Sequence, residues 1–133
     1  MKILVTGAEG QLARSLVERA QAHRGVELVA IGRPKLDLAI PGSATAAIEA
    51  IRPDLVINAA AYTADTPAAH DPALAFRINS EAAGEVAAAA AHAGAAVVQI
   101  STDYVFDGHR TGPYVETSPT NPLGVYGSSK LAG

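Results

Sequence analysis

The sequence predicts an α/β protein built on a doubly wound parallel sheet, with helices on both faces. Four short apolar runs alternate with stretches whose apolar residues recur at helical spacing, a pattern typical of such sheets. The 133 residues, 49% of them hydrophobic, are enough for one domain with a substantial core. The residues best suited to binding and catalysis follow the carboxyl ends of the apolar runs, where ligands bind in this class of fold.

The first half of the chain predicts two strands and two helices. Residues 2–6 are apolar and end in a glycine turn, so we expect a buried strand there. Apolar residues at helical spacing predict a helix over residues 11–23, and a second apolar run predicts a strand over residues 26–31. Ser43 is expected to cap a short helix ending near Ile51, because a serine side chain can accept a hydrogen bond from the first helical turn.

The second half predicts two further strands and two further helices. Residues 54–58 and 95–100 are apolar and give the third and fourth strands. Between them, Pro72 starts a long helix expected to run to about residue 92, since proline suits the first helical turn. Residues 101–123 are expected to form a loop, and Val125 begins the last helix.

The composition excludes several classes of protein. There is no cysteine, which rules out disulfides and thiolate metal sites, and the four histidines share no ligand spacing, so no metal is expected. The net charge is −3 with no basic run, which gives no sign of nucleic-acid binding. No apolar run is long enough for a signal sequence or a membrane span, so we expect no membrane partner and a cytoplasmic location.

A glycine turn follows the first predicted strand. Gly7 permits a tight turn, Gly10 lacks the Cβ that would block a phosphate, and Ala13 still lets the helix pack closely on the strand. The helix beginning at Gln11 offers unpaired N–H groups and the positive end of its dipole to an anion. This strand–turn–helix pattern predicts a Rossmann-type site for the pyrophosphate of a dinucleotide rather than a purely structural turn.

The end of the second predicted strand bears on the choice of cofactor. An NAD site usually has an acidic residue about twenty positions beyond the glycines, where it holds the ribose 2′-hydroxyl. This chain has Gly32 and Arg33 there. A guanidinium suits the geometry of a 2′-phosphate, so Arg33 favours NADPH, with NADH as the other candidate. A solvated arginine in a turn is the alternative interpretation of the same residue.

Tyr126 and Lys130 form the candidate catalytic pair. A spacing of four residues places both side chains on the same face of a helix. An ammonium beside a phenol favours the phenolate and makes a tyrosine a better proton donor. Thr102 follows the fourth predicted strand, where a hydroxyl can reach a substrate oxygen. Beside a dinucleotide site, these residues predict reduction of a carbonyl; a Tyr and a Lys on a solvated helix face are the structural alternative.

Four segments carry a resemblance to a known family: residues 7–12 (GAEGQL), 52–63 (RPDLVINAAAYT), 101–108 (STDYVFDG) and 121–133 (NPLGVYGSSKLAG). They resemble the N-terminal part of the dTDP-4-dehydrorhamnose reductases, which are extended short-chain dehydrogenases/reductases. The STDYVFDG segment is the most specific, because related sugar dehydratases tend to carry an acidic residue where this chain has Tyr104.

The resemblance implies a reaction and the residues that carry it out. Tyr126 would donate a proton to the C4 carbonyl oxygen of a dTDP-4-keto-6-deoxysugar, so that dTDP-4-dehydrorhamnose becomes dTDP-rhamnose with hydride from NADPH. Lys130 would hold the nicotinamide ribose and Thr102 would hydrogen-bond the reacting oxygen. Thr63 and Tyr104 would face the sugar. The implied cofactor contacts are Gly7, Gly10, Gln11 and Leu12 at the pyrophosphate, Asp37 and Leu38 near the adenine, and Ala60, Ala61 and Tyr62 along the cofactor.

The chain also departs from the family pattern. Residues 65–71 replace a segment that usually contains a lysine and a glutamate. In the family, the sugar-nucleotide domain, the remaining strands and the dimer contacts lie beyond the equivalent of Gly133. We therefore expect residues 1–133 to be a C-terminally incomplete NAD(P)-binding Rossmann domain of a homodimeric enzyme, inactive on its own. An epimerase of the same superfamily and a non-catalytic regulatory subunit are the alternatives; Tyr104 disfavours the first and an intact Tyr126 the second.

Overall fold

The computed structural model describes residues 1–63 and 71–133, and it contains a four-stranded parallel sheet in the order β2-β1-β3-β4. The strands are β1 (Lys2–Thr6), β2 (Glu27–Ile31), β3 (Leu55–Asn58) and β4 (Ala96–Gln99). Their register brings Val5 opposite Ala30 on one side and Ile57 on the other. The four predicted strands and the doubly wound order are confirmed. No end of a strand differs from its predicted position by more than one residue.

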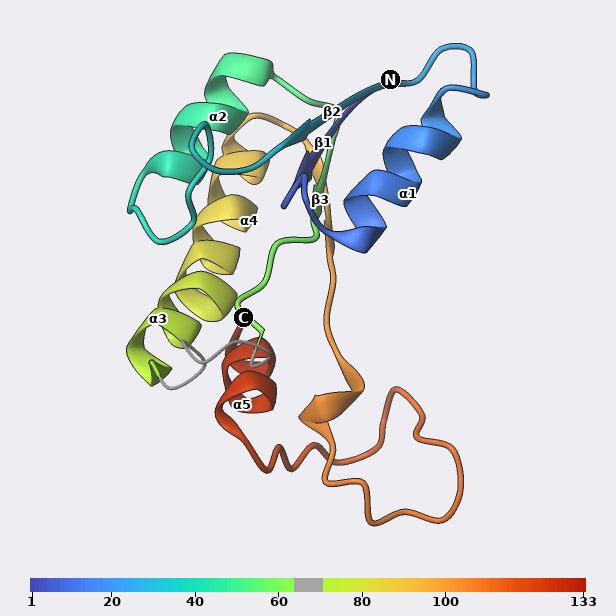
Figure 1. The fold of residues 1–133 in the computed structure, drawn as a ribbon, viewed down its shortest axis with the longest axis vertical. Helices are drawn as coiled ribbons and strands as arrows, with labels where there is room; N and C mark the ends of the chain where they lie inside the picture. The colour runs from blue at the N-terminus through green and yellow to red at the C-terminus, as the bar shows by residue number, and fades with distance from the viewer. Residues whose placement is uncertain (64–70) are drawn as a thin grey trace.

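Helices cover both faces of the sheet (Figure 1). Helix α1 (Gln11–Ala20) packs on one face, and α2 (Ser43–Ile51) and α4 (Ala82–His92) pack on the other. The two cores are separate, and Leu4 and Val56 contribute to the α2/α4 core while Ile3 and Val5 contribute to the α1 core. The period-two alternation of a strand divides β1 between the two cores, which is why its whole run is apolar.

Two helix termini differ from the sequence-based prediction. Helix α1 ends at Ala20 rather than near residue 23, because the amides of Ala22 and His23 bond to carbonyls three residues back and tighten the chain into turns. The N-cap of α2 is Gly42, with φ +83°, and not Ser43. The Ser43 hydroxyl instead accepts a hydrogen bond from the amide of Asp37, 3.0 Å away, and so ties the preceding loop to the helix.

The long helix predicted from Pro72 is divided by a π-helical turn. It consists of α3 (Pro72–Phe76), the π-turn η1 (Arg77–Glu81) and α4. The expected unbroken α-helix is therefore wrong over these five residues. A π-turn inserts an extra residue into the helical repeat and is common at functional sites. Here Asn79 lies in the middle of the turn, and its side chain bonds with neighbouring segments.

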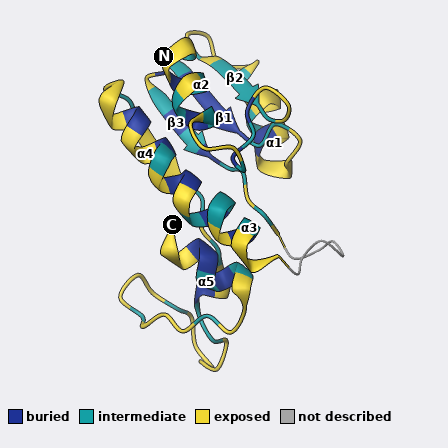
Figure 2. Ribbon diagram, turned by 90° about the vertical axis from the view of Figure 1, so that its left-hand side faces the viewer, coloured by how far each residue is buried: buried dark blue, intermediate teal, exposed yellow. Residues whose placement is uncertain are grey.

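The carboxyl ends of the strands carry the remaining elements. A 3-10 turn, η2 (Asp103–Val105), lies within the predicted loop, and α5 (Val125–Ala132) packs against α3, η1 and η2. Figure 2 shows that α5 turns buried residues inward. At the far edge of the sheet, the residues of β4 are all exposed. Within residues 1–63 and 71–133, no helix combines the length and apolar character needed to cross a bilayer.

Candidate active site

The glycine turn brings three segments into close contact. Gly7 has φ +77°, and a Cβ at this position would lie 2.9 Å from the Cα of Ala60. Its carbonyl accepts a hydrogen bond from the amide of Gly10 at 2.9 Å, which closes the turn. Gly10 is the N-cap of α1 in an extended conformation, so the first N–H groups of α1 point out of the turn. The requirement for glycine at position 7 is therefore both conformational and steric.

An elongated cavity of about 800 Å³, the glycine-turn cavity, opens above this turn. It contains most of the residues that were predicted to bind a dinucleotide: Gly7, Gly10, Arg33, Asp37, Leu38, Ala60, Ala61 and Tyr62. Gln11 and Leu12 lie in the first turn of α1 and do not line it, although their backbone belongs to the same helix terminus. Arg33 lies at its rim, where its side chain can contact an anion.

Asp37 and Leu38 lie at one end of the glycine-turn cavity. The Asp37 carboxylate accepts a hydrogen bond from the amide of Ala39 at 3.0 Å and so shapes the loop before α2. Leu38 is 6% exposed and belongs to the α2/α4 core, so its side chain serves packing while its backbone borders the cavity. The guanidinium of Arg77 donates to the carbonyl of Ala39, a residue of the same loop, at 3.4 Å.

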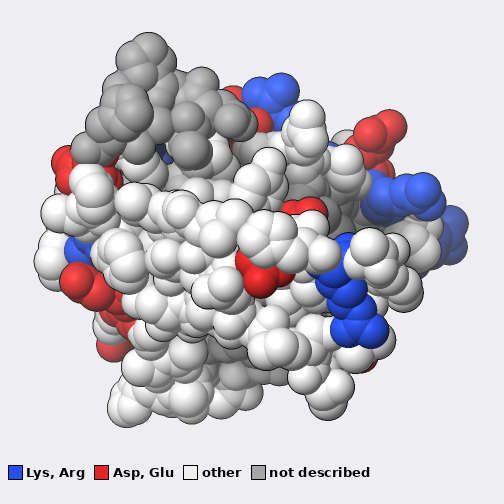
Figure 3. Space-filling model, turned by 90° about the horizontal axis from the view of Figure 1, so that it is seen from below, with Lys and Arg blue, Asp and Glu red and all other residues white. Residues whose placement is uncertain are grey.

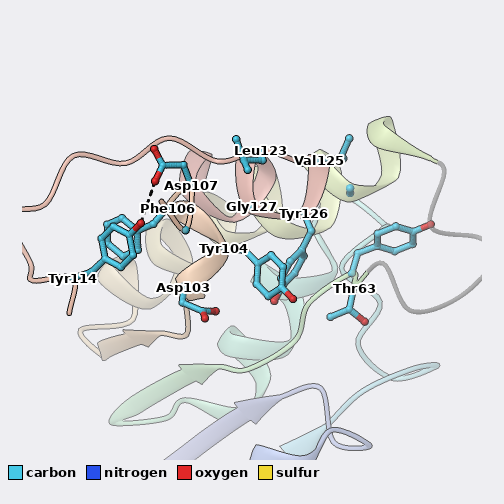
Figure 4. Close-up of a pocket in the computed structure, with 14 residues that line it drawn as sticks. Thr63, Asp103, Tyr104, Phe106, Asp107, Tyr114, Leu123, Val125, Tyr126 and Gly127 are labelled. Atoms are coloured by element: carbon cyan, nitrogen blue, oxygen red, sulfur yellow. Dashed lines mark hydrogen bonds between the residues drawn. The ribbon is translucent and has the colours of Figure 1, made fainter. Parts of the chain in front are cut away.

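A second cavity of about 850 Å³, the tyrosine cavity, lies between α5 and the loop around η2. Figure 4 shows Tyr104 and Tyr126 side by side, with both hydroxyls pointing the same way. Their ring centroids are 5.9 Å apart and the rings meet edge to face at 66°, an arrangement that aromatic pairs favour. Phe106 stacks on Tyr114 at 4.1 Å farther along the wall.

Carboxylates are the charged groups in the lining of the tyrosine cavity, which contains Asp103 and Asp107. The amide of His109 and the side chains of Asn121 and Tyr114 donate hydrogen bonds to Asp107, and they hold the pKa of its carboxyl below the usual value. These bonds also order the loop around the cavity. Seen from this end, most of the described surface is free of Lys and Arg (Figure 3).

The two cavities adjoin at Tyr62 and Thr63, which line both of them. A ligand in the glycine-turn cavity and another in the tyrosine cavity would therefore meet beside these two residues. Tyr126 lines the second cavity only, and its ring is half-buried. A shared wall would bring the two ligands close together, as a reaction between them requires.

Lys130 follows Tyr126 by about one helical turn on α5 and is 6% exposed. Its ammonium donates a hydrogen bond to the carbonyl of Ile100, the residue that follows β4. Burial lowers the pKa of the Lys130 amine below its ordinary value, because removal from water disfavours the charged form. The structure thus places the ammonium of Lys130 against the end of the sheet, where a backbone carbonyl holds it.

Among the described residues, the Thr102 side chain makes hydrogen bonds only to nearby residues of its own segment. Its hydroxyl accepts from the amide of Tyr104 at 3.2 Å and caps η2, and it also lies 3.2 Å from a carboxylate oxygen of Asp103. The Thr102 side chain lines neither cavity. Of the three predicted catalytic residues, Tyr126 borders a cavity, Lys130 is buried and bonds to the carbonyl of Ile100, and Thr102 orients the segment that carries Tyr104.

A ladder of polar side chains joins the carboxyl ends of three strands. The Thr6 hydroxyl donates to Asn58 at 2.6 Å, and the Asn58 amide donates to Gln99 at 2.8 Å. The Gln99 amide then donates to the carbonyl of Ile100 at 3.1 Å, the same carbonyl that holds Lys130. The ladder therefore connects the residue before the glycine turn to the carbonyl that positions the lysine.

Sequence reasoning missed the part that Ser129 plays and left that of Asn79 open. Asparagine has a low helix propensity, so its place in mid-helix suggests either a buried hydrogen bond to a neighbouring strand or loop or a plain exposed position. The structure confirms the first, because Asn79 is 2% exposed and bonds to Tyr62 and Ser129. Ser129 gives no comparable signal, since a serine inside a helix is more often exposed than bonded across it.

The predicted divergence at residues 65–71 falls almost entirely outside the described residues. Its last member, Asp71, is described and caps α3 by accepting a hydrogen bond from the amide of Leu74 at 3.0 Å. This is the usual role of an aspartate before a helix that begins with proline.

Comparison with known proteins identifies the family to which this fold and site belong. The profile of the family described as RmlD substrate binding domain matches residues 1–133. The chain belongs to this family. A relative from Burkholderia thailandensis, a dTDP-4-dehydrorhamnose reductase, is 48% identical over 137 residues, which cover 100% of this chain and 44% of the relative.

Solved structures of RmlD-family proteins show the same fold. A dTDP-4-dehydrorhamnose reductase from Clostridium acetobutylicum matches with a TM-score of 0.91 at 39% identity, over 99% of this chain and 47% of that one. A reductase of the same name from Bacillus anthracis, solved in complex with NADP, matches with a TM-score of 0.89 at 36% identity, over 98% and 46% of the two chains. The chain thus spans a little under half the length of the relatives it matches.

Proposed function

We propose that this chain provides the NADPH site and the proton donor of a dTDP-4-dehydrorhamnose reductase, and that residues 1–133 form its Rossmann domain. The observation that carries the proposal is the junction of the two cavities. A glycine turn suited to a pyrophosphate lies on one side, a tyrosine suited to proton donation lies on the other, and Tyr62 and Thr63 border both. Relatives with this name, one of them solved with NADP, support the choice of reaction.

In the proposed reaction, the chain positions two partners and supplies one proton. The reduced nicotinamide supplies the hydride that reaches the C4 carbon of dTDP-4-dehydrorhamnose. Tyr126 donates its hydroxyl proton to the C4 oxygen, so the carbonyl gains one hydride and one proton and becomes the alcohol of dTDP-rhamnose. Lys130, buried on α5 one helical turn after Tyr126, supplies the positive charge that favours the phenolate left on Tyr126.

The remaining assignments follow from the lining of the cavities. The backbone around Gly7 and Gly10 is the proposed pyrophosphate site, because a Cβ on either glycine would crowd the turn. Arg33, at the cavity rim, is the proposed partner of the 2′-phosphate of NADPH. Thr63 and Tyr104 are the proposed contacts of the sugar. We also propose that the enzyme works as a homodimer in the cytoplasm.

The first test is a titration of the chain with NADPH and with NADH, followed by nicotinamide fluorescence. We expect saturable binding with the tighter constant for NADPH, and R33A should abolish the preference without abolishing binding. Because the chain spans 44% of the Burkholderia relative, turnover is measured in a chimaera that joins residues 1–133 to the remainder of that relative. The assay follows NADPH oxidation on addition of dTDP-4-dehydrorhamnose.

The possible results separate the parts of the proposal. Binding of neither cofactor to a folded chain would contradict the dinucleotide site. Equal binding of both, unchanged in R33A, would contradict the role of Arg33 alone. An epimerase would change the configuration of a sugar without net consumption of NADPH, so steady NADPH oxidation matched by formation of dTDP-rhamnose distinguishes the reductase.

A further inference from the structure

Two buried polar side chains connect α5 to the wall between the two cavities. Asn79 is 2% exposed and Ser129 is 0% exposed, and neither takes part in the proton transfer described above. Burial of unsatisfied amide and hydroxyl groups is costly, so such groups persist only where their hydrogen bonds are complete. In the described part of the chain, every buried side-chain nitrogen and oxygen has a partner.

The side-chain amide of Asn79 makes two hydrogen bonds to the backbone of Tyr62. Its Oδ1 accepts from the amide of Tyr62 at 2.8 Å, and its Nδ2 donates to the carbonyl of the same residue at 2.9 Å. Two bonds to one residue fix both the distance and the orientation of the segment that holds Tyr62. That segment lies outside any helix or strand, so these two bonds replace the ladder that would otherwise hold it.

The second N–H of Asn79 reaches α5. Nδ2 donates to the Ser129 hydroxyl at 3.0 Å, and that hydroxyl donates to the carbonyl of Tyr126 at 2.9 Å. The directions are mutually consistent, because the serine oxygen accepts one bond while its proton makes the other. A continuous path of four hydrogen bonds therefore runs from the backbone of Tyr62 through Asn79 and Ser129 to the backbone of Tyr126.

The π-turn makes this path possible. Asn79 lies in the middle of η1, where the widened turn carries its side chain towards α5 and the Tyr62 segment. On its other side α5 packs closely against η2, because a Cβ on Gly127 would lie 2.9 Å from the carbonyl carbon of Tyr104. The Asn79–Ser129 bond then fixes how α5 is rotated about its axis, and with it the direction of the Tyr126 ring.

We propose that Asn79 and Ser129 are positioning residues. Their hydrogen bonds lock the backbone of Tyr126 in a fixed position relative to Tyr62, which lines both cavities. This rests on the proposed function, since the lock matters to catalysis only if Tyr126 is the proton donor. The inference itself concerns coupling between distant residues. A substitution at Ser129 should change the hydrogen exchange of Tyr62, which Ser129 does not bond in this structure. A substitution at Asn79 should change the orientation of the Tyr126 ring.

The test is an NMR comparison of the folded chain with N79A, S129A and the matched control S128A. Ser128 is the neighbouring serine on α5 and takes no part in the path from Asn79 to Tyr126. Two signals are followed: hydrogen exchange of the Tyr62 amide, and the cross-relaxation between the rings of Tyr104 and Tyr126. Exchange is normalised to the amides of Val5 and Val56, which lie in the fully buried centre of the sheet and report global opening.

In S129A, we expect the normalised exchange of the Tyr62 amide to rise about threefold to tenfold and the ring cross-relaxation to weaken. N79A should do both more strongly, and the double variant should resemble N79A rather than the sum of the two, because the residues act in one chain. S128A should leave both signals at the wild-type values. S129C, which keeps the volume and a weak donor, should fall between wild type and S129A.

A merely structural role gives a different result. Exchange would then rise by the same factor at Tyr62, Val5 and Val56, and the ring signal of the folded molecules would stay unchanged; either finding in S129A overturns the proposal. NADPH is titrated into the same samples as a separate measurement. Failure of the wild-type chain to bind NADPH would contradict the proposed function, whereas unchanged Tyr62 exchange in S129A with intact NADPH binding would contradict the positioning role alone.

Discussion

The two ends of the proposed site are held together by different means. The glycine-turn end consists of one strand, one turn and one helix that are adjacent in sequence, and backbone contacts such as that of Gly7 with Ala60 shape it. The tyrosine end is assembled from segments far apart in the chain, and buried side chains such as Asn79 and Lys130 hold it. Backbone geometry thus defines the first end, and polar bonds of buried side chains define the second.

This difference has a consequence for how each end responds to substitution. A backbone site is disturbed by added volume and by residues that cannot adopt its dihedral angles. A site held by side-chain hydrogen bonds is disturbed by loss of a single donor or acceptor, even when the volume is conserved. The following predictions test that distinction at each end.

The largest expected effect is that of Y126F on turnover. Phenylalanine keeps the edge-to-face contact with Tyr104 and removes only the hydroxyl that donates the proton. Loss of a general acid typically lowers the rate by about 10²–10⁴-fold, so NADPH oxidation by the chimaera should fall by that order. NADPH binding should be unchanged, because Tyr126 lines the tyrosine cavity only. Retention of more than half the wild-type turnover would remove Tyr126 from the mechanism.

The next effect is that of G7A on stability, measured by urea denaturation. Alanine at φ +77° costs about 1–2 kcal/mol, and its Cβ would lie 2.9 Å from the Cα of Ala60, which adds about 1–3 kcal/mol. G25A is the matched control, because Gly25 has φ +91° and no atom of the described residues lies within 4 Å of the place that an alanine Cβ would occupy.

The difference between the two variants isolates the close approach of the backbone. G25A should cost only the conformational part, about 1–2 kcal/mol, and should leave NADPH binding intact. G7A should be less stable than G25A and should bind NADPH more weakly, because the turn must shift away from Ala60. Equal losses of stability in G7A and G25A would show that the contact with Ala60 does not constrain the turn.

The same distinction explains which features the sequence was able to predict. The strands, the glycine turn and the helix after it follow from apolar runs and from residues with particular backbone freedom, and these signals are local. The π-turn at Asn79 and the path through Ser129 depend on which segments meet in the folded chain. Neighbours that distant in sequence leave no periodic signal, so the sequence predicted Tyr126 and Lys130 but not what positions them.

Thr102 shows the same limit from the other direction. Its place after the fourth strand was predicted correctly, and a hydroxyl there suggested contact with a substrate oxygen. In the structure the hydroxyl bonds to the amide of Tyr104 and to Asp103. Local capping competes for such hydroxyl groups, and the choice between capping and ligand binding depends on geometry that the sequence does not specify.

The pH dependence of the free energy of unfolding, compared between wild type and K130M, tests whether the Lys130 ammonium is buried at the tyrosine end. Burial lowers the pKa of Lys130 in the folded state, so the unfolded chain holds this proton more tightly than the folded chain does. The resulting cost to stability is fully present below the lowered pKa. It is relieved as the pH rises through the lowered pKa towards about 10.5, the ordinary value for lysine.

We therefore expect wild type to gain stability relative to K130M between neutral pH and about pH 10.5, as measured by urea denaturation at several pH values. Methionine fills a similar volume but cannot donate to the carbonyl of Ile100, so the variant should also lose turnover at all pH values. A stability difference that does not change with pH would mean that Lys130 is solvated in the folded chain.

The smallest expected effect is that of E85Q, because Glu85 lines neither cavity. Burial alone would raise the pKa of Glu85, but hydrogen bonds from Arg77 and from the amides of Gly42 and Thr45 outweigh it, so the pKa lies below the ordinary 4.5. The ionised carboxylate therefore stabilises the fold above about pH 4.5, and this contribution is lost as the pH falls through the lowered pKa.

E85Q should lower the free energy of unfolding by about 1 kcal/mol or less near pH 7, since glutamine keeps a hydrogen-bonding oxygen but not the charge that faces Arg77. The gap between wild type and E85Q should close below about pH 4.5, whereas E49Q, at an exposed position on α2, should match wild type throughout. NADPH binding should be unaffected. If E85Q weakened NADPH binding without unfolding the chain, side-chain bonds would also hold the glycine-turn end, and the contrast between the two ends would fail.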